Sequence, residues 1–142
     1  MNRAKANRDL DRVWQLMAGL VMDSRGDWRR KVAEVTGLPF TRVRALWRLA
    51  EGERTLAELA ASMGTDAPAA TVIVNDLEER GLVERRVHPD DRRARLVSIT
   101  AAGKKLLHAA SAVTDRAPQS IAKLGAADVK ELLRILGPLA RK

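Results

Sequence analysis

The hydrophobic period of the sequence changes once in its central part, and this change limits the folds open to the chain. Apolar residues recur at helical spacing over Leu56–Met63 and over Ala67–Arg80, and Gly64 separates the two segments. The period then falls to two residues in Leu82–Val87 and Ala94–Ile99, a pattern typical of short strands. We therefore expect two helices joined by a tight turn and followed by a β-hairpin.

The ends of these helices carry local signals. Thr55 and Glu58 have the spacing of a capping box, in which a hydroxyl and a carboxylate satisfy the free amides of a first turn. Thr65 or Asp66 can cap the second helix, which tolerates a proline in its first turn. Gly81 supplies the left-handed residue that ends it.

Further helical patterns lie on both sides of this central part. We expect helices over Asn7–Met22, Asp27–Thr36 and Phe40–Ala50 before it. After it we expect one helix that begins behind Thr100 and is broken or kinked at Pro118, and then another over Ala126–Leu139. The fold class is therefore mainly α with a small β-hairpin wing, which is the element order of a winged helix-turn-helix.

Composition narrows the functional classes. The 142 residues include no cysteine, which excludes thiol catalysis, cysteine-ligated zinc and thiol redox sensing. His88 and His108 have no neighbouring nucleophile and no metal-ligand spacing, so we expect no enzymatic activity, no metal and no cofactor. No apolar run approaches the roughly 18 residues of a membrane span, and the N-terminus is charged, so we expect a cytoplasmic protein.

The formal net charge of +8 favours a polyanionic partner, and much of that charge is concentrated in the expected hairpin. Five arginines fall there, namely Arg85, Arg86, Arg92, Arg93 and Arg95. A protein-interaction module can share this element order, and the basic surface would then be incidental. A non-specific, nucleoid-type DNA-binding protein is a further alternative.

Three blocks of sequence resemble the MarR family of transcriptional regulators: Leu56–Ala60, Leu77–Val83, and the stretch from Asp91 through Ile99 to Gly103. The resemblance implies a homodimer in which N-terminal helices (residues 1–36) and C-terminal helices (101–142) form the dimerisation region. Residues 37–100 would form a winged-helix lobe, and the two lobes of the dimer would bind double-stranded DNA. The alternative is that the terminal helices pack on each other within one chain.

The resemblance also implies roles in the wing. Arg93 would enter the minor groove, and Asp91 would orient it. An arginine suits this position because it is always charged and slim enough for a narrow groove of negative potential. Arg92, Arg85, Arg86 and Arg95 would reach flanking phosphates. The alternative is a solvated hairpin whose arginines pair with Asp90 and Asp91.

The second helix of the motif would read DNA with the face opposite Ala70, Ile73, Val74 and Leu77, which we expect in the core. This helix carries no arginine that could read guanine bidentately, so we expect binding to depend more on backbone charge, the wing and DNA shape. Thr71 and Asn75 would act as hydrogen-bonding readers, or alternatively as a spacer and a local cap. The expected DNA-contacting residues of this region are Thr65, Ala67, Pro68, Ala69, Thr71, Val72 and Asn75.

Members of the family often bind small aromatic or phenolic ligands between the dimerisation region and the lobe. Aromatic side chains beside guanidinium groups would suit an aromatic carboxylate, and the candidate residues are Trp14, Trp28, Arg29, Arg44 and Trp47. The alternative is that the tryptophans belong to the core. The resemblance thus favours a sequence-specific repressor that such an effector releases from DNA.

Overall fold

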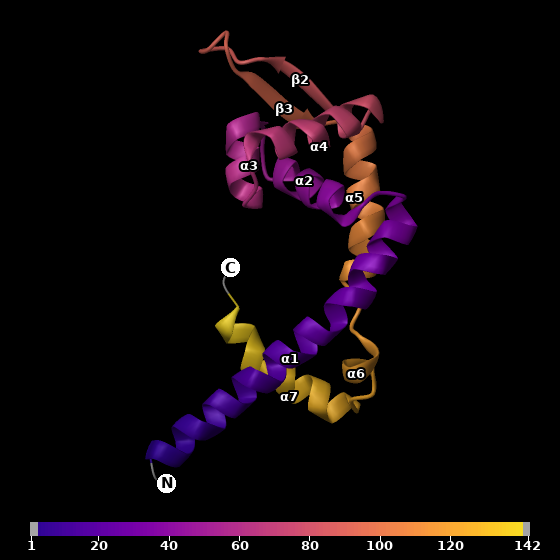
Figure 1. Cartoon of the computed structure of the whole chain (residues 1–142). Coiled ribbons are helices and arrows are strands. Elements are labelled where there is room, and N and C mark those ends of the chain that lie inside the picture. The colour runs from indigo at the N-terminus through magenta and orange to yellow at the C-terminus, as the bar shows by residue number, and fades with distance from the viewer. Residues whose placement is uncertain (1–2, 141–142) are drawn as a thin grey trace. The chain divides into compact units, whose positions relative to one another are not determined.

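A computed structural model describes residues 3–140 of the chain (Figure 1). The elements are α1 (Arg3–Thr36), α2 (Phe40–Ala50), β1 (Arg54–Thr55), α3 (Leu56–Met63), α4 (Ala67–Glu79), β2 (Val83–Val87), β3 (Arg95–Ile99), α5 (Ala101–Thr114), α6 (Gln119–Ala122), α7 (Ala126–Leu136) and the short 3₁₀ helix η1 (Gly137–Leu139). They form two compact units. One comprises residues 27–115, called the lobe below, and the other combines the chain up to residue 26 with the chain from residue 116.

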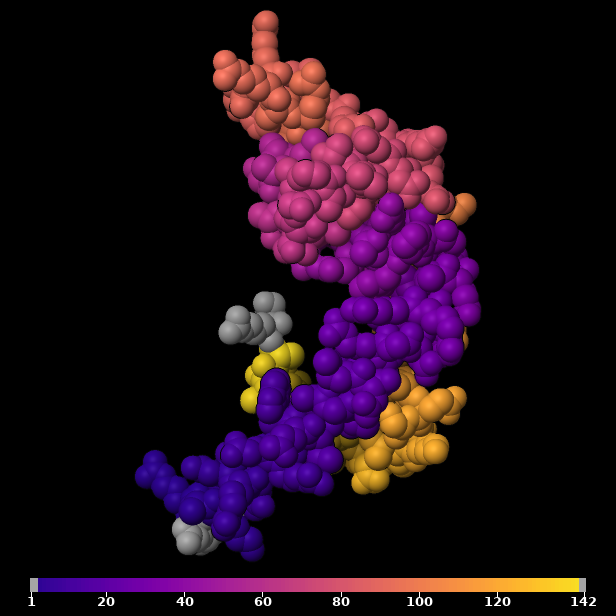
Figure 2. Space-filling model, in the orientation of Figure 1, coloured from indigo at the N-terminus to yellow at the C-terminus, as the bar shows by residue number. Residues whose placement is uncertain are grey.

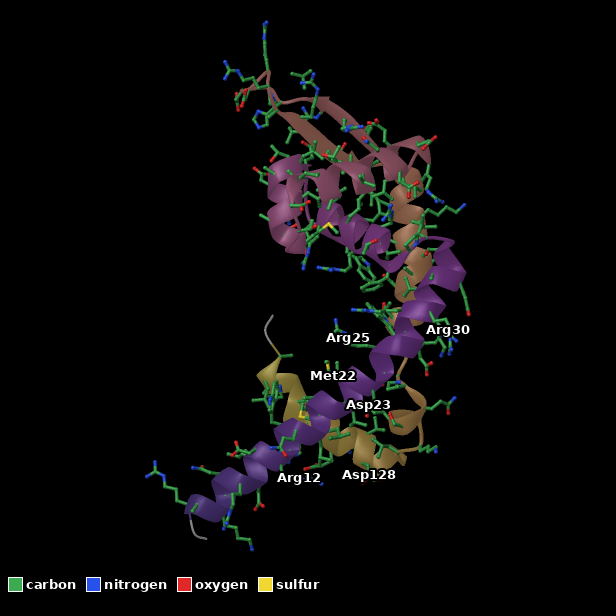
Figure 3. All side chains as sticks on the ribbon, in the orientation of Figure 1. Arg12, Met22, Asp23, Arg25, Arg30 and Asp128 are labelled. Carbon is green, nitrogen blue, oxygen red and sulfur yellow. The ribbon has the colours of Figure 1, made fainter. Side chains whose placement is uncertain are left out.

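The N-terminal part is one continuous helix, so the prediction of two helices separated near residue 25 was wrong. The hydroxyl of Ser24 donates to the carbonyl of Leu20 at 2.7 Å and thus bonds within the helix instead of ending it. Gly26 costs only about 1 kcal/mol in a helix interior, which the flanking helix-forming residues offset. Figure 3 labels Arg12, Met22 and Asp23 along this uninterrupted ribbon. The helix ends where predicted, before Gly37 at φ 68°.

Helices α3 and α4 form the predicted helix-turn-helix. The capping box at the start of α3 is confirmed, since Thr55 Oγ1 accepts the Glu58 amide at 3.2 Å and Glu58 Oε2 accepts the Thr55 amide at 3.1 Å. Gly64 ends α3 in the left-handed conformation at φ 65°. Of the two predicted caps of α4, Asp66 takes the role, accepting the Ala69 amide at 2.8 Å.

The hairpin belongs to a three-stranded antiparallel sheet with the order β1-β3-β2. Strands β2 and β3 lie within one residue of their predicted bounds, whereas β1 was not predicted. Two residues are too few to show an alternating pattern, and β1 forms only because Arg54 and Thr55 pair with Val97 and Leu96 of β3. In the hairpin, Val83 pairs with Ile99 and Arg85 with Val97.

The core of the lobe lies between this sheet and helices α2 to α5, and the end of α1 contributes Val32. Its largest fully buried side chains include Leu46, Leu59, Leu77 and Val97. Among the described residues, no polar or charged side chain is buried. Apolar packing therefore stabilises the interior of the lobe. Its charged groups remain at the surface, where they are accessible to a polyanion.

The second unit has a different character, because none of residues 3–26 and 116–140 is buried. The sequence predicted one helix up to Leu139, but α7 ends at Leu136 and the chain continues as η1, since Gly137 and Pro138 do not favour a longer helix. Helix α6 was not predicted; its four residues are too short for a periodic signal.

Candidate nucleic-acid interface

Helix α4 shows the predicted division into a buried and an exposed side. Its core side is confirmed, because Ala70, Ile73, Val74 and Leu77 are all buried. On the other side, Val72 keeps 59% of its surface exposed, and Asn75 is also exposed. An apolar side chain with that exposure, next to a polar one, forms a surface that the lobe itself does not cover.

The other predicted residues of this region fall into two groups. Ala67 and Pro68 are exposed at the start of α4, whereas Thr65 and Ala69 are half-buried. The hydroxyl of Thr71 donates to the carbonyl of Ala67 at 2.9 Å. Its single proton is thus used within the helix, and only its lone pairs are open to another molecule.

Two of the acidic residues of α4 are paired with arginines. Asp76 accepts from Arg80 Nε at 3.0 Å and from Arg42 Nε of α2 at 3.2 Å. The hydrogen bond from Arg80, and after it that from Arg42, lowers the pKa of the Asp76 carboxyl below its ordinary value. The carboxylate is therefore held ionised and compensated, which reduces the repulsion that a nearby phosphate backbone would meet.

The second acidic residue connects α4 to the sheet. Arg85 of β2 donates to both oxygens of Glu78, from Nη2 at 3.0 Å and from Nε at 3.2 Å, and this hydrogen bonding lowers the pKa of the Glu78 carboxyl. The same Nη2 donates to Asn75 Oδ1 at 2.6 Å. The Nε and Nη2 groups of Arg85 thus donate to side chains of α4. Its contact with a flanking phosphate stays a prediction.

Sequence reasoning missed that Arg85 and Arg86 lie on opposite faces of the sheet. Successive side chains of a strand alternate between faces, so Arg85 shares the face of buried Val83 and reaches α4. Arg86 points to the other face and pairs with Glu53 ahead of β1. The apolar Val83 two residues earlier was the available signal, because the alternation of a strand places Arg85 on the same face as Val83.

The loop between β2 and β3 is held by its own backbone. Asp91 Oδ1 accepts the backbone amide of Arg93 at 2.9 Å, and the Asp91 carbonyl accepts the amide of Ala94 at 3.1 Å. Arg95 braces the loop by donating to the carbonyls of Arg92 and Ala94. Asp91 thus contacts Arg93 through the main chain, no bond joins its carboxylate to the guanidinium, and its role in orienting that guanidinium stays a prediction.

The side chains of Arg92 and Arg93 are exposed, and within residues 3–140 neither has an ion-pair partner. The alternative in which the loop arginines pair with Asp90 and Asp91 is thus not what the structure contains. Figure 2 shows the tip of the hairpin, in orange, projecting beyond the body of the lobe. Two cations stand at the end of an arm that no other part of the lobe covers.

The sequence profile of the MarR family matches residues 36–94, which include both helices of the motif, β2 and the wing loop. This part of the chain belongs to the MarR family. Solved structures extend the likeness over the rest. The transcriptional regulator BldR from Sulfolobus solfataricus is 26% identical, with a TM-score of 0.62, over 98% of this chain and 97% of that one.

Two further structures are similar to this chain. A MarR-family transcriptional regulator from Rhodococcus sp. RHA1 is 27% identical, with a TM-score of 0.64, over 91% of this chain and 92% of that one. The MepR protein of S. aureus, solved as a complex with DNA, is 18% identical, with a TM-score of 0.62, over 88% of this chain and 99% of that one. At that identity MepR supports the fold alone.

The predicted ligand residues of the MarR-family lobe are only partly brought together. Trp28 and Trp47 stack at 5.5 Å between ring centroids, Phe40 meets both edge-on, and all three pack against the core. The guanidinium of Arg29 lies 4.8 Å from the centre of the Phe40 ring. Of the remaining two candidates, Arg44 makes no cation–π contact with these rings within residues 3–140. Arg44 donates to the Met63 carbonyl at 3.2 Å, and Trp14 belongs to the other unit, 69% exposed.

Other kinds of site find little support in the described part of the chain. Residues 3–140 contain no group of three or more His, Asp or Glu side chains that could hold a metal ion. Nor does any helix among them combine the length and apolar character needed to cross a membrane. His88 accepts the Asp90 amide within the wing loop, and His108 lies exposed on α5.

Proposed function

We propose that this protein is a sequence-specific DNA-binding transcriptional regulator that acts as a homodimer. The observation that carries the proposal is that one lobe has both an exposed face of α4 and a wing tip with two arginines that form no ion pair within residues 3–140. In a winged helix-turn-helix, the second helix of the motif enters the major groove. An arginine at the wing tip can then reach the narrow, strongly negative minor groove beside it.

The charges of the lobe support this proposal. The first two acidic residues of α4 that follow the exposed Asn75 in sequence are Asp76 and Glu78. Both form ion pairs with arginines. Arg92 and Arg93, on the projecting loop, have no ion-pair partner within residues 3–140. Neutralising phosphates with arginine releases condensed counterions, and this release supplies much of the affinity of such proteins for DNA.

The test is a selection from a random duplex library, followed by titrations of the selected and a shuffled sequence at several salt concentrations. We expect the wild type to prefer the selected sequence and to protect two half-sites about one helical turn apart. R93A should bind more weakly, with a salt slope reduced by about one. K105A, which removes an exposed charge from α5, is the matched control and should bind like the wild type. Failure of the library to yield any preferred sequence would contradict the proposal and favour a nucleoid-type protein or an interaction module.

The homodimer is supported by the second unit. None of its described residues is buried, and large apolar side chains cover α1 and α7, including Val13 (53% exposed), Trp14 and Leu133 (both 69%). Burying apolar surface is the main favourable term in folding and association, at roughly 25 cal/mol per Å². A unit with so much uncovered apolar surface is stable only when another surface covers it, and a second copy presents the same apolar stripes.

The oligomeric state can be tested by light scattering coupled to gel filtration. We expect the wild type to elute with twice the chain mass of 15.6 kDa. L133E should raise the dimer dissociation constant by at least about tenfold, because a buried unpaired carboxylate is costly. S120E adds the same charge at an exposed position on α6 and should leave the dimer intact. A monomeric wild type at micromolar concentration would refute the dimer.

The proposal includes repression relieved by a small aromatic carboxylate. The stacked Trp28 and Trp47, half-buried in the lobe, and the guanidinium of Arg29 next to Phe40 support this ligand class. Titration with salicylate should change tryptophan fluorescence and weaken DNA binding, and by linkage DNA should weaken ligand binding by the same factor. Unchanged fluorescence and unchanged DNA affinity would remove this ligand class from the proposal.

A further inference from the structure

We infer that Arg85 sets the base preference of Asn75 by fixing its amide so that the two N–H donors, and not the carbonyl oxygen, are offered to the DNA. The inference rests on the proposed function and names a specificity-determining residue within the same interface. Asn75 is exposed on α4, and Arg85 is its neighbour on β2. Arg85 would act as a positioning residue, without itself touching a base.

The orientation of the amide follows from the chemistry of its partner. A guanidinium has five N–H donors and no acceptor, so the end of the Asn75 amide that faces it must be the oxygen. That oxygen lies 2.6 Å from Arg85 Nη2, whereas the Asn75 Nδ2 group makes no hydrogen bond to the rest of residues 3–140. The donor end of the amide is therefore the end left open.

Arg85 is itself held in place. Two bonds to Glu78, at 3.0 and 3.2 Å, fix the plane of the guanidinium. The side chain of Arg85 is only 24% exposed, and its backbone is paired with Val97 in the hairpin. Rotating the Asn75 amide by half a turn would bring N–H groups against N–H groups and lose the 2.6 Å bond. The amide is thus pre-oriented before any DNA arrives.

This orientation has a consequence for base recognition. A free asparagine reads adenine bidentately, donating to N7 and accepting from the N6 amino group. With its oxygen held toward the wing, Asn75 instead offers two donors, which suit the base whose groove edge carries two acceptors. Guanine, with N7 and O6, is that base. The arginine-poor helix would thus still carry one guanine reader.

The test uses a set of duplexes in which each base pair of the selected half-site is replaced in turn. The affinity of each duplex is measured for four proteins: the wild type and three variants. N75A identifies the base position that depends on Asn75. E78Q removes a charge but keeps an acceptor for Arg85, so the bond between Arg85 and Asn75 remains. R85M/E78Q removes that bond at the same net charge as the wild type, and methionine retains the apolar stem of the arginine. Circular dichroism verifies that each variant is folded.

We expect the wild type and E78Q to prefer guanine over adenine at one position of each half-site, by on the order of tenfold, and N75A to lose that preference. In R85M/E78Q the amide is free to turn, and the ratio of guanine to adenine affinity should fall by about tenfold or more.

Three results would overturn the inference while leaving the proposed function intact: an Asn75-dependent preference for adenine in the wild type, an unchanged preference in R85M/E78Q, or no position that responds to N75A. If no preferred sequence is selected by the wild type, the proposed function fails first, and the inference fails with it.

Discussion

Replacing Gly103 by alanine should destabilise the lobe, although alanine is the better helix former. Gly103 is buried in the first turn of α5, directly beneath the start of the wing. A Cβ atom there would lie 2.3 Å from the carbonyl oxygen of Leu82 and 2.6 Å from a side-chain carbon of Ile99. The carbonyl would have to retreat by about 1.1 Å to reach ordinary contact at 3.4 Å.

Three contributions set the size of the effect. Overpacking of this kind costs about 1–3 kcal/mol. The Leu82 carbonyl also accepts a hydrogen bond from the amide of Thr100 at 3.0 Å. Displacing this carbonyl would weaken that bond, which contributes about 1 kcal/mol. The better helix propensity of alanine returns about 1 kcal/mol. We therefore expect G103A to lose about 2 kcal/mol of the free energy of unfolding.

The assay is urea unfolding followed by far-UV circular dichroism, at one protein concentration, since association shifts apparent stability. The matched control is G26A, another glycine inside a helix, at which an added Cβ meets nothing within 4 Å in this chain. It should gain about 0.5–1 kcal/mol. If G103A unfolds at the same urea concentration as the wild type, or at a higher one, the close approach of α5 to Leu82 does not constrain the lobe.

Two smaller effects can be measured by the same unfolding assay. T55A removes one bond of the capping box directly and should lower the free energy of unfolding by about 1 kcal/mol. T65A removes a hydroxyl that makes no hydrogen bond within the described structure, and it should lower that free energy by less than half as much. Equal losses in both variants would contradict the capping role. The pKa of Asp76 is lowered in the folded state by Arg80 and Arg42, so its contribution to stability is present above the unfolded pKa and is lost as the pH falls through the folded one. D76N should therefore flatten the loss of stability below about pH 4, while D90N, at an exposed site without an ion pair, should not.

The sequence by itself determined the elements whose signals are local. The spacing of Ala70, Ile73, Val74 and Leu77 predicted the buried side of α4, because a helix brings positions three and four apart onto one face. Capping by Thr55 and helix termination at Gly64 were also predictable, since both depend on backbone groups within a few residues. The two hairpin strands followed from their period of two residues.

Some elements were decided by longer-range pairing or by the length of the pattern. Strand β1 is only two residues long and exists through its bonds to β3. Helix α1 continues through Gly26, where a single unfavourable residue suggested a break, because the cost of one glycine is small against that of ending a long helix. The compact lobe correspondingly begins inside α1, at residue 27, directly after the glycine that suggested the break.

The candidate site divides in the same way. The sequence determined which residues α4 and the wing present, and the exposed Arg92 and Arg93 follow from their place in a turn-forming loop. Only the tertiary structure decided which partners these residues meet. Arg85 and Asn75 lie ten positions apart, on a strand and on a helix, and their 2.6 Å contact depends on how the sheet packs against α4. Local periodicity fixes the face on which a side chain lies, whereas the group opposite that face is set by the packing of the whole lobe.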